Sequence, residues 1–219
     1  LDIPYTHSGV LASALAMDKP VAKSIFEAVG IKVAEHKIVS REELVAGVME
    51  PPFVVKPYNE GSSVGVHIVM EGDNYQPAEE EWSFGRSVMV EKFVPGRELT
   101  VSVMGGRPLA VTEITTGHGF YDYDAKYADG GSEHQIPAEI PKDVYEEAMR
   151  ISVLAHKCLG CRGVSRADIR YDGSDLYLLE INTQPGMTPT SLVPEQAAHA
   201  NISFNELVSW LVENAATDD

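Results

Sequence analysis

The sequence is short of basic residues, long apolar runs and cysteine. Its 219 residues include 17 Lys or Arg against 33 Asp or Glu, a formal net charge of −16, which argues against nucleic acid as a partner. No apolar run approaches the length of a membrane span, and no charged-then-apolar leader marks a signal peptide. We therefore expect a soluble cytoplasmic protein without a nucleic-acid or membrane partner.

The two cysteines, Cys158 and Cys161, form the motif CLGC. A structural zinc site needs four ligands and usually a second such pair, but no second pair is present and the seven histidines are scattered. The phosphate-binding motif G-x-x-x-x-G-K-[ST] is absent, and no G-x-G-x-x-G follows a strand. We expect the two cysteines to be reduced thiols that bind no zinc. A nucleotide-binding site, if present, would have to use a motif other than these two glycine-rich ones.

Helical and extended segments occur in blocks. Capped, periodic segments predict four helices, over 17–31, from 40 towards 51, over 142–161 and over 203–215. The first has apolar residues at 21, 25, 26 and 29. Apolar, β-branched runs predict strands at 53–57 and 66–70, a three-stranded antiparallel meander over 87–114, and a hairpin over 164–183. Residues 71–87 and 115–137 are expected to be long loops. The predicted class is α+β.

The hairpin carries charged side chains on apolar strands. Side chains alternate between the faces of a strand, so Leu178, Glu180 and Asn182 are expected on one face. A three-residue turn at DGS would bring Asp168 opposite or diagonal to Glu180, whereas a turn of even length would separate them. Together Asp168, Glu180 and Asn182 would offer hard oxygen ligands for Mg²⁺ or Mn²⁺. The alternative is a structural salt bridge from Arg166 to Asp168 or Glu180.

Phosphate could be bound by the loop YNEGSSVG, residues 58–65, which follows the strand that holds Lys56. Small residues let backbone N–H groups approach an anion, and Ser62 and Ser63 add further donors. An ordinary hairpin turn is the alternative. Lys56 and Lys126 are candidate charge clamps on a phosphate, against the alternative of surface lysines with apolar stems.

A glutamate and a lysine also interrupt the apolar strand 88–94, at Glu91 and Lys92, and Glu98 follows a Pro-Gly turn. A carboxylate at Glu98 could accept hydrogen bonds from ribose hydroxyls, and the backbone from Lys92 to Val94 could contact an adenine edge. Cross-strand ion pairing is the alternative. The joint occurrence of these signals with the hairpin carboxylates favours a site for Mg-ATP.

Six motifs then occur together, in the order MDK, VVKPYNEGSSVG, VEKFVPGRELTV, GFYDYDAKY, SRADIR and LLEINTQPGMTPTSLVP. In this combination the chain resembles the D-alanine–D-alanine ligases, members of the ATP-grasp superfamily. The resemblance implies two α+β subdomains whose antiparallel sheets grip ATP between them, at 13–89 and 90–219. Residues 1–12 would be a remnant of the linker from a missing amino-terminal α/β domain.

The resemblance also implies a role for each matching position. Nucleotide contacts are implied for Lys19, Lys56, Glu60, Ser62, Ser63, Glu91, Lys92, Val94, Glu98 and Lys126. Two Mg²⁺ (or Mn²⁺) ions would be held by Asp168, Glu180 and Asn182. Implied catalytic groups are Arg166 and the Gly186 N–H at an oxyanion, Lys126 at the transferred phosphate, and Tyr127 bonded to Ser62. D-Alanine contacts are implied for Tyr121, Arg166, Gly186, Ser191 and Leu192.

The implied activity joins two D-alanines to D-alanyl-D-alanine with ATP, through an acylphosphate, for peptidoglycan precursor synthesis by a homodimer. The chain opens at residue 1 with neither Met nor a capping signal, and the family's amino-terminal domain helps to bind the first D-alanine. We therefore expect this chain alone to bind Mg-ATP weakly and to be incomplete for catalysis. Alternatives are a D-alanine–D-lactate ligase, which the YDYDAKY segment at 121–127 disfavours, a catalytically silent nucleotide-binding fragment, and a Mg²⁺-dependent phosphodiesterase.

Overall fold

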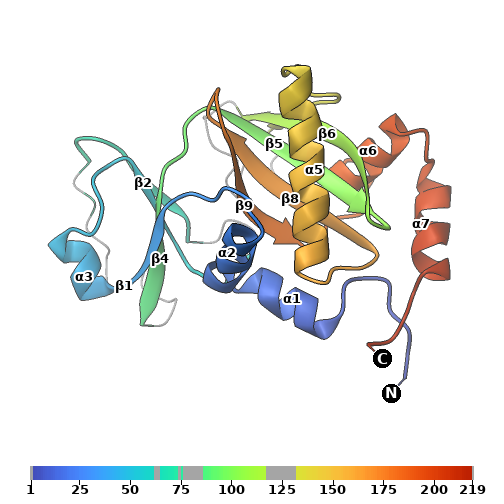
Figure 1. Ribbon diagram of the computed structural model, residues 1–219, viewed down its shortest axis with the longest axis horizontal. Coiled ribbons are helices and arrows are strands. Elements are labelled where there is room, and N and C mark those ends of the chain that lie inside the picture. Colours follow the sequence, from blue (N-terminus) through green and yellow to red (C-terminus); the bar gives the residue numbers. More distant parts are fainter. Residues whose placement is uncertain (1, 62–64, 74, 76–85, 117–131, 219) are drawn as a thin grey trace.

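A computed structural model describes residues 2–61, 65–73, 75, 86–116 and 132–218 (Figure 1). Two antiparallel sheets dominate the described part of the chain. The four-stranded sheet has the order β1-β4-β2-β3 and consists of β1 (His36–Ser40), β2 (Phe53–Lys56), β3 (His67–Val69) and β4 (Ser87–Lys92). The five-stranded sheet has the order β7-β6-β5-β8-β9 and consists of β5 (Arg97–Met104), β6 (Arg107–Thr116), β7 (Ser132–Gln135), β8 (Val164–Tyr171) and β9 (Leu176–Asn182). The α+β class is therefore confirmed.

Helices cover both sheets. They are α1 (Val10–Met17), α2 (Lys19–Ala28), α3 (Arg41–Ala46), α5 (Lys142–Cys158), α6 (Leu192–His199) and α7 (Phe204–Glu213). The predicted N-caps are confirmed: Asp18 caps α2, and Ser40 and Ser203 each form a capping box, which satisfies backbone N–H groups that the first helical turn leaves without partners. α1, α6, β1 and β7 were not expected from the sequence.

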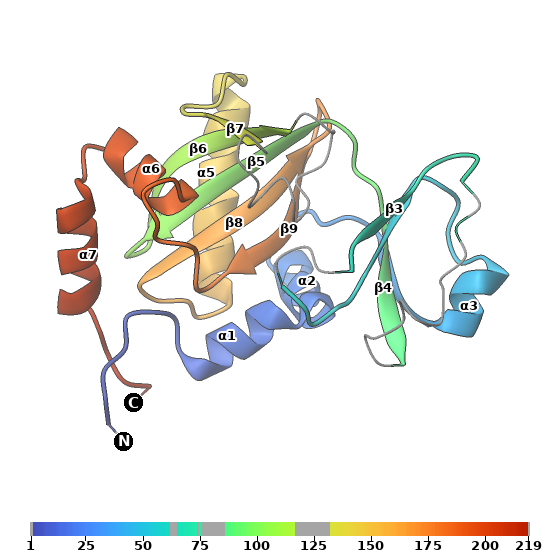
Figure 2. The ribbon, with the colours of Figure 1, turned by 180° about the vertical axis from the view of Figure 1, so that it is seen from behind.

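The main hydrophobic core lies on one face of the five-stranded sheet. Buried residues of β5, β8 and β9, such as Leu99, Ile169 and Leu178, pack there against α5. Although α1 and α2 come before the four-stranded sheet in the chain, Ala16 and Phe26 belong to this same core. α2 consequently lies between the two sheets, as both views show (Figure 1 and Figure 2).

Two smaller cores complete the packing. On the four-stranded sheet, Val55, Val88 and Val90 pack with Leu44 of α3. On the other face of the five-stranded sheet, α6 and α7 pack around Val193 and form a third core. None of the helices in the described part of the chain is long and apolar enough to cross a membrane.

The predicted meander over 87–114 is wrong at its first turn. β4 pairs with β1 and β2, whereas β5 pairs with β6 and β8, so Pro95-Gly96 joins the two sheets instead of closing a hairpin. Gly96 has φ +99°, and a Cβ built there would lie 2.2 Å from the carbonyl oxygen of Tyr171. Only glycine fits this close passage beside β8. Strand periodicity marks β4 and β5 but carries no information about which sheet each one joins.

Candidate functional site

The hairpin of β8 and β9 does bring the predicted ligands together. Asp168 lies opposite Glu180, and Arg166 lies opposite Asn182. Asp168 and Glu180 are partly exposed, with side-chain exposures of 13% and 33%. Two carboxylates and an amide therefore share one face of the sheet, within reach of water and of a ligand.

The route to this register differs from the predicted one. The connection spans the four residues 172–175, an even number, because Tyr171 pairs with Leu176. A β-bulge between Asp168 and Ile169 of β8 then leaves Leu179 of β9 as an extra residue. The bulge turns Glu180 to the face of Asp168 and leaves Leu178 on the core face. The expectation that Leu178, Glu180 and Asn182 share one face is therefore wrong.

Arg166 forms the salt bridge that the sequence left open as the alternative. Its Nε and Nη2 donate to Asp168 Oδ1 and Oδ2 at 2.9 and 2.7 Å, and Thr100 Oγ1 donates to Asp168 Oδ1 at 2.8 Å. A bidentate guanidinium fixes the orientation of the Asp168 carboxylate. Arg166 is thus fixed beside the proposed ligands at the edge of the site.

The oxygen atoms of Asp168, Glu180 and Asn182 suit Mg²⁺ bound together with a substrate better than a metal ion bound by protein ligands alone. Among the residues the structure describes, no three Asp, Glu, His or Cys side chains gather into a metal site. Asp168, Glu180 and Asn182 instead supply two carboxylates and one amide oxygen. Mg²⁺ is usually bound by one or two carboxylates together with substrate phosphates. The set is therefore suited to a cation that arrives with a nucleotide.

Lysines face this hairpin from the other side of the site. Lys56 of β2 lies with its Nζ 2.5 Å from Glu91 Oε2 of β4, and Lys23 of α2 contacts the other oxygen of the same carboxylate. Burial by itself would raise the pKa of Glu91, but the two ammonium groups outweigh it and lower that pKa to about 2. Glu91 is therefore a carboxylate held ionised between two lysines.

Lys19, at the first position of α2, connects the two sheets. Its Nζ donates to the carbonyl oxygen of Glu60 at 2.5 Å and lies 3.6 Å from Glu180 Oε2, while its backbone N–H donates to Tyr58 O at 3.0 Å. Burial lowers the pKa of Lys19, and the charge of Glu180 opposes that shift. One cation thus contacts both the loop after β2 and the carboxylate of β9.

The segment that joins the sheets carries the predicted adenosine contacts. The N–H of Lys92 donates to Glu35 O at 2.8 Å, and the carbonyl of Val94 accepts from Arg170 Nε at 3.1 Å. Arg170 Nη1 also donates to Glu98 at 3.2 Å. Glu98 and Arg170 line a cavity of about 190 Å³. These backbone and side-chain bonds fix Val94 and Glu98 relative to Arg170.

The turn after β9 brings two predicted substrate contacts together. A Cβ at Gly186 would lie 2.8 Å from Ser191 Oγ, so a side chain there would displace the serine. Ser191 Oγ accepts from the N–H of Thr188 at 3.0 Å and lies directly before α6, whose first residue is the buried Leu192. Gly186, Ser191 and Leu192 are therefore one local unit.

Gln196 of α6, which was not predicted, anchors this unit to the sheet. The side chain is fully buried; its Oε1 accepts from Ser102 N at 2.7 Å, and its Nε2 donates to Thr100 O at 3.1 Å and to Thr112 Oγ1 at 2.9 Å. Thr100 is also the residue that donates to Asp168. A buried glutamine gives no sequence signal, because glutamine is common on exposed helix faces.

Lys23 was also missed, although a signal was present. The buried residues of α2 are Lys19, Ala22, Lys23 and Phe26, a spacing of i, i+3, i+4 and i+7 that defines one helix face. The apolar positions that indicated the helix, 21, 25, 26 and 29, do not all lie on this face, because Val21 and Val29 are about 40% exposed. Two lysines at i and i+4 on the buried face were the missing clue.

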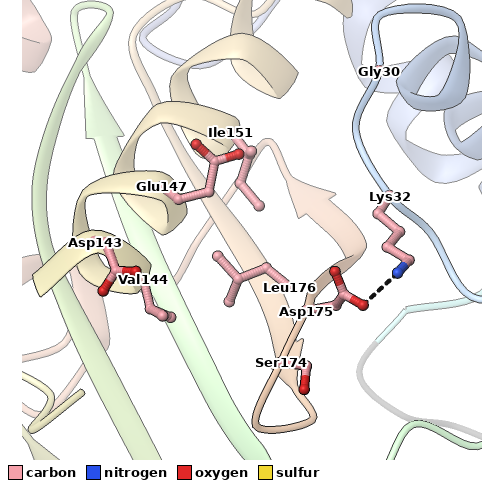
Figure 3. A pocket seen from close by; sticks show the side chains of 9 residues that line it. All are labelled: Gly30, Lys32, Asp143, Val144, Glu147, Ile151, Ser174, Asp175 and Leu176. Carbon is pink, nitrogen blue, oxygen red and sulfur yellow. Dashed lines mark hydrogen bonds and ion pairs between the residues drawn. The ribbon is translucent and has the colours of Figure 1, made fainter. Parts of the chain in front are cut away.

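Two other features lie apart from this site. A cavity of about 260 Å³ opens between α5 and the β8–β9 connection, where Lys32 and Asp175 form an exposed ion pair of 2.6 Å (Figure 3). Cys158 and Cys161 are free thiols, and burial raises the pKa of Cys161 to about 11. The predictions for Ser62, Ser63, Tyr121, Lys126 and Tyr127 lie outside the described residues.

The chain matches known sequences over almost its whole length. Residues 25–213 match the family described as D-ala D-ala ligase C-terminus. The chain is 61% identical over 218 residues to a D-alanine--D-alanine ligase of Rhodospirillum rubrum, covering 99% of this chain and 72% of that protein. It is 58% identical to a D-alanine--D-alanine ligase of Parvibaculum lavamentivorans, covering 100% of this chain and 74% of that protein.

Solved structures give the same result. The D-alanine--D-alanine ligase of Bacillus anthracis has a TM-score of 0.79 and 32% identity, covering 96% of this chain and 70% of that one. The structure of the Bacillus anthracis ligase complexed with ATP has a TM-score of 0.77 and 31% identity over the same shares. These likenesses confirm the predicted family and its two-sheet ATP-grasp fold.

Proposed function

The chain belongs to the D-alanine–D-alanine ligase family. From this premise we propose that two groups of charged residues bind ATP and catalyse the joining of two D-alanines: the lysines around Glu91, and the carboxylates of the β8–β9 hairpin. The activity is ATP-dependent ligation to D-alanyl-D-alanine, a building block of peptidoglycan. One observation supports the assignment most strongly. Lys19 lies between the loop after β2 and Glu180 of β9, so that the groups proposed to bind phosphate and metal are neighbours.

In the first step, a carboxylate oxygen of one D-alanine attacks the γ-phosphorus of ATP, the bond to the β-phosphate oxygen breaks, and ADP leaves. Lys19 and Lys56 offset the negative charge at the phosphates, where positioning and electrostatics provide most of the catalysis. We assign Lys126 to the transferred phosphate, with Ser62, Ser63 and Glu60 in the loop that covers the nucleotide. Tyr127 would bond to Ser62 and close the site.

In the second step, the amine of the other D-alanine attacks the acyl carbon, loses a proton, and inorganic phosphate leaves. Arg166 and the N–H of Gly186 stabilise the oxyanion. Ser191 and Leu192 bind the carboxylate of the acceptor, and Tyr121 contacts substrate. The closeness of Gly186 to Ser191 supports this arrangement, because the residues proposed to bind the oxyanion and the acceptor are neighbours.

Asp168, Glu180 and Asn182 would hold two Mg²⁺ (or Mn²⁺) ions, which when bound supply positive charge beside the phosphates. The oxygen donors fit this role, and Arg166 orients the Asp168 carboxylate. For the nucleoside, the segment of Glu91, Lys92 and Val94 would contact adenine, and Glu98 would accept from the ribose. The cavity that Glu98 and Arg170 help to line supports the ribose contact.

Two further predictions concern organisation. The division into a linker at 1–12, a central subdomain at 13–89 and a carboxy-terminal subdomain at 90–219 stays a prediction, which limited proteolysis with mass analysis would test. A homodimer is likewise a prediction, to be tested by sedimentation over a range of concentrations. A cytoplasmic location also remains to be tested, by cell fractionation.

The direct test of function measures phosphate release and dipeptide formation from ATP, Mg²⁺ and D-alanine. We expect little of either product from these 219 residues alone, and both products in equal amounts once the amino-terminal part of a related ligase is supplied, with D-alanine preferred over D-lactate as acceptor. A preference for D-lactate would favour the depsipeptide ligases. ADP binding without D-alanine-dependent phosphate release, even with that part supplied, would indicate a silent nucleotide-binding module, and failure to bind ADP would contradict the proposal as a whole.

A further inference from the structure

Lys23 is a buried cation that takes no part in the mechanism above. Its side chain is 0% exposed, whereas those of Lys19 and Lys56 retain 9% and 11% exposure. All three lysines lie near one another, but Lys19 and Lys56 reach the open side of the site and Lys23 does not. Lys23 is therefore shielded from any ligand and can act only through its neighbours.

The neighbour of Lys23 is Glu91. Its Nζ contacts Glu91 Oε1, while Lys56 Nζ lies 2.5 Å from Glu91 Oε2. Within the described part of the chain, Lys23 Nζ and Glu91 Oε1 have no well-aligned hydrogen bond to any other group. An enclosed ammonium is costly, and an apolar residue of similar length would serve the packing of α2 better. The position therefore calls for an electrostatic explanation.

The number of charges around Lys23 supplies an electrostatic explanation. Three lysines, at 19, 23 and 56, face the two glutamates Glu91 and Glu180, so the cluster has one positive charge in excess. Without Lys23 the count would be two against two. Among the described residues, Lys56 would then be the remaining lysine beside the buried Glu91 carboxylate, and its transfer to a phosphate would leave that carboxylate without a counter-charge, which is costly.

We propose that Lys23 is a positioning residue for nucleotide binding: by neutralising and holding Glu91, it leaves the ammonium of Lys56 available to the phosphates. The inference rests on the proposed function, since it requires that Lys56 contact phosphate. It assigns Lys23 no contact with ATP. Burial lowers the pKa of Lys23, and the Glu91 carboxylate opposes that shift more than Glu180 does, which is consistent with an ammonium stabilised mainly by Glu91.

The experiment compares ADP with adenosine, since only ADP carries phosphates. Affinities of the 219-residue chain for both are measured by calorimetry, with Lys23→Met as the variant. We expect ADP to bind about 10- to 100-fold more weakly, the value of one charged hydrogen bond, with adenosine affinity unchanged. Lys32→Met, at an exposed lysine, is the matched control and should leave the ADP-to-adenosine ratio unchanged.

If Lys23 only stabilised the structure, Lys23→Met would lower the affinity for ADP and for adenosine together, because a loosened site binds both less tightly. Restoration gives a second readout: in the Lys23→Met/Glu91→Gln double variant, Lys56 has no carboxylate to neutralise, so the ratio should return towards that of the unmodified chain. If Lys23→Met alone does not fold, the double variant decides, and a low ratio there overturns the inference. An unchanged ratio in folded Lys23→Met also overturns it, whereas an unmodified chain that does not bind ADP overturns the proposed function itself.

Discussion

The charged cluster on the four-stranded sheet and the one on the β8–β9 hairpin differ in their access to water. Lys23, Lys56 and Glu91 have side-chain exposures of 0%, 11% and 4%. On the hairpin, Arg166 and Asp168 are each 13% exposed and Glu180 is 33% exposed. Both clusters pair cations with carboxylates, but one is enclosed by protein and the other is partly exposed.

This difference in exposure predicts that substitutions in the enclosed cluster affect mainly the stability of the fold, and those in the exposed cluster mainly ligand binding. In an enclosed cluster the desolvation cost is already incurred on folding, so removal of one partner leaves a buried charge and threatens the fold. In a cluster at the surface of a cleft, water or a ligand can replace a lost partner, so the same substitution affects binding more than stability. We therefore expect neutralised glutamates in the two clusters to have different consequences.

The largest effect is expected for Glu91→Gln. The substitution leaves the ammonium groups of Lys23 and Lys56 without a counter-charge, and we expect it to lower the free energy of unfolding by about 3–5 kcal/mol. Urea denaturation measures this. Lys23→Met/Glu91→Gln should recover most of the loss, because it removes the more deeply buried of the two lysines. A loss below about 1 kcal/mol in the single variant would show that the cluster is better solvated than its burial indicates.

The same cluster should make the free energy of unfolding depend on pH in acid. The folded-state pKa of Glu91, about 2, lies below the ordinary 4.5, so its stabilisation is complete above pH 4.5 and is lost as the pH falls towards 2. The loss amounts to about 3 kcal/mol. Unfolding free energies measured between pH 5 and 2.5 should fall more steeply in the unmodified chain than in Glu91→Gln. Parallel curves would assign the acid sensitivity to other carboxylates.

For the exposed cluster, Glu180→Gln should change binding and spare the fold. We expect Mg²⁺-dependent affinity for ATP to fall about a hundredfold or more, which is about 2.7 kcal/mol, with the melting temperature nearly unchanged. Titration of ATP with and without Mg²⁺ measures the metal-dependent part. Survival of both the fold and the Mg-ATP affinity would remove Glu180 from the proposed ligand set.

The smallest effect is expected for Asp175→Asn on the β8–β9 connection. It removes one carboxylate from the same hairpin, but Asp175 pairs with Lys32 at the surface, where water replaces the lost partner. Neither the melting temperature nor the Mg-ATP affinity should change measurably. A loss of affinity here would mean that long-range charge, rather than the ligand oxygens, controls binding.

Local rules identified most elements, and distant contacts account for the misses. Asp18, Ser40 and Ser203 marked helix starts correctly, because a cap depends on the next three residues. The destination of β4 could not be predicted, because pairing with β1 or β5 depends on parts of the chain outside any local window. The short β7, with its alternately half-buried and exposed residues, has too little pattern to recognise.

The candidate site shows the same division. Individual residues such as Asp168 and Glu180 stood out because carboxylates on apolar strands need partners. Their convergence was predicted correctly but for the wrong reason, since a bulge and not an odd turn sets the register. Gln196 was missed because burial is a property of the folded chain and glutamine is ordinarily exposed, whereas Lys23 could have been suggested by its i, i+4 spacing from Lys19.

The bulge at Leu179 has a consequence for β9 that resembles a one-base insertion in a reading frame. Before it, the even positions Leu176 and Leu178 face the core; after it, the odd position Ile181 does. Alignment of this strand with a regular one therefore requires a one-residue gap at Leu179. Without that gap, every position from 180 onward is assigned to the wrong face, and the residues that face the ligand are mistaken for residues of the core.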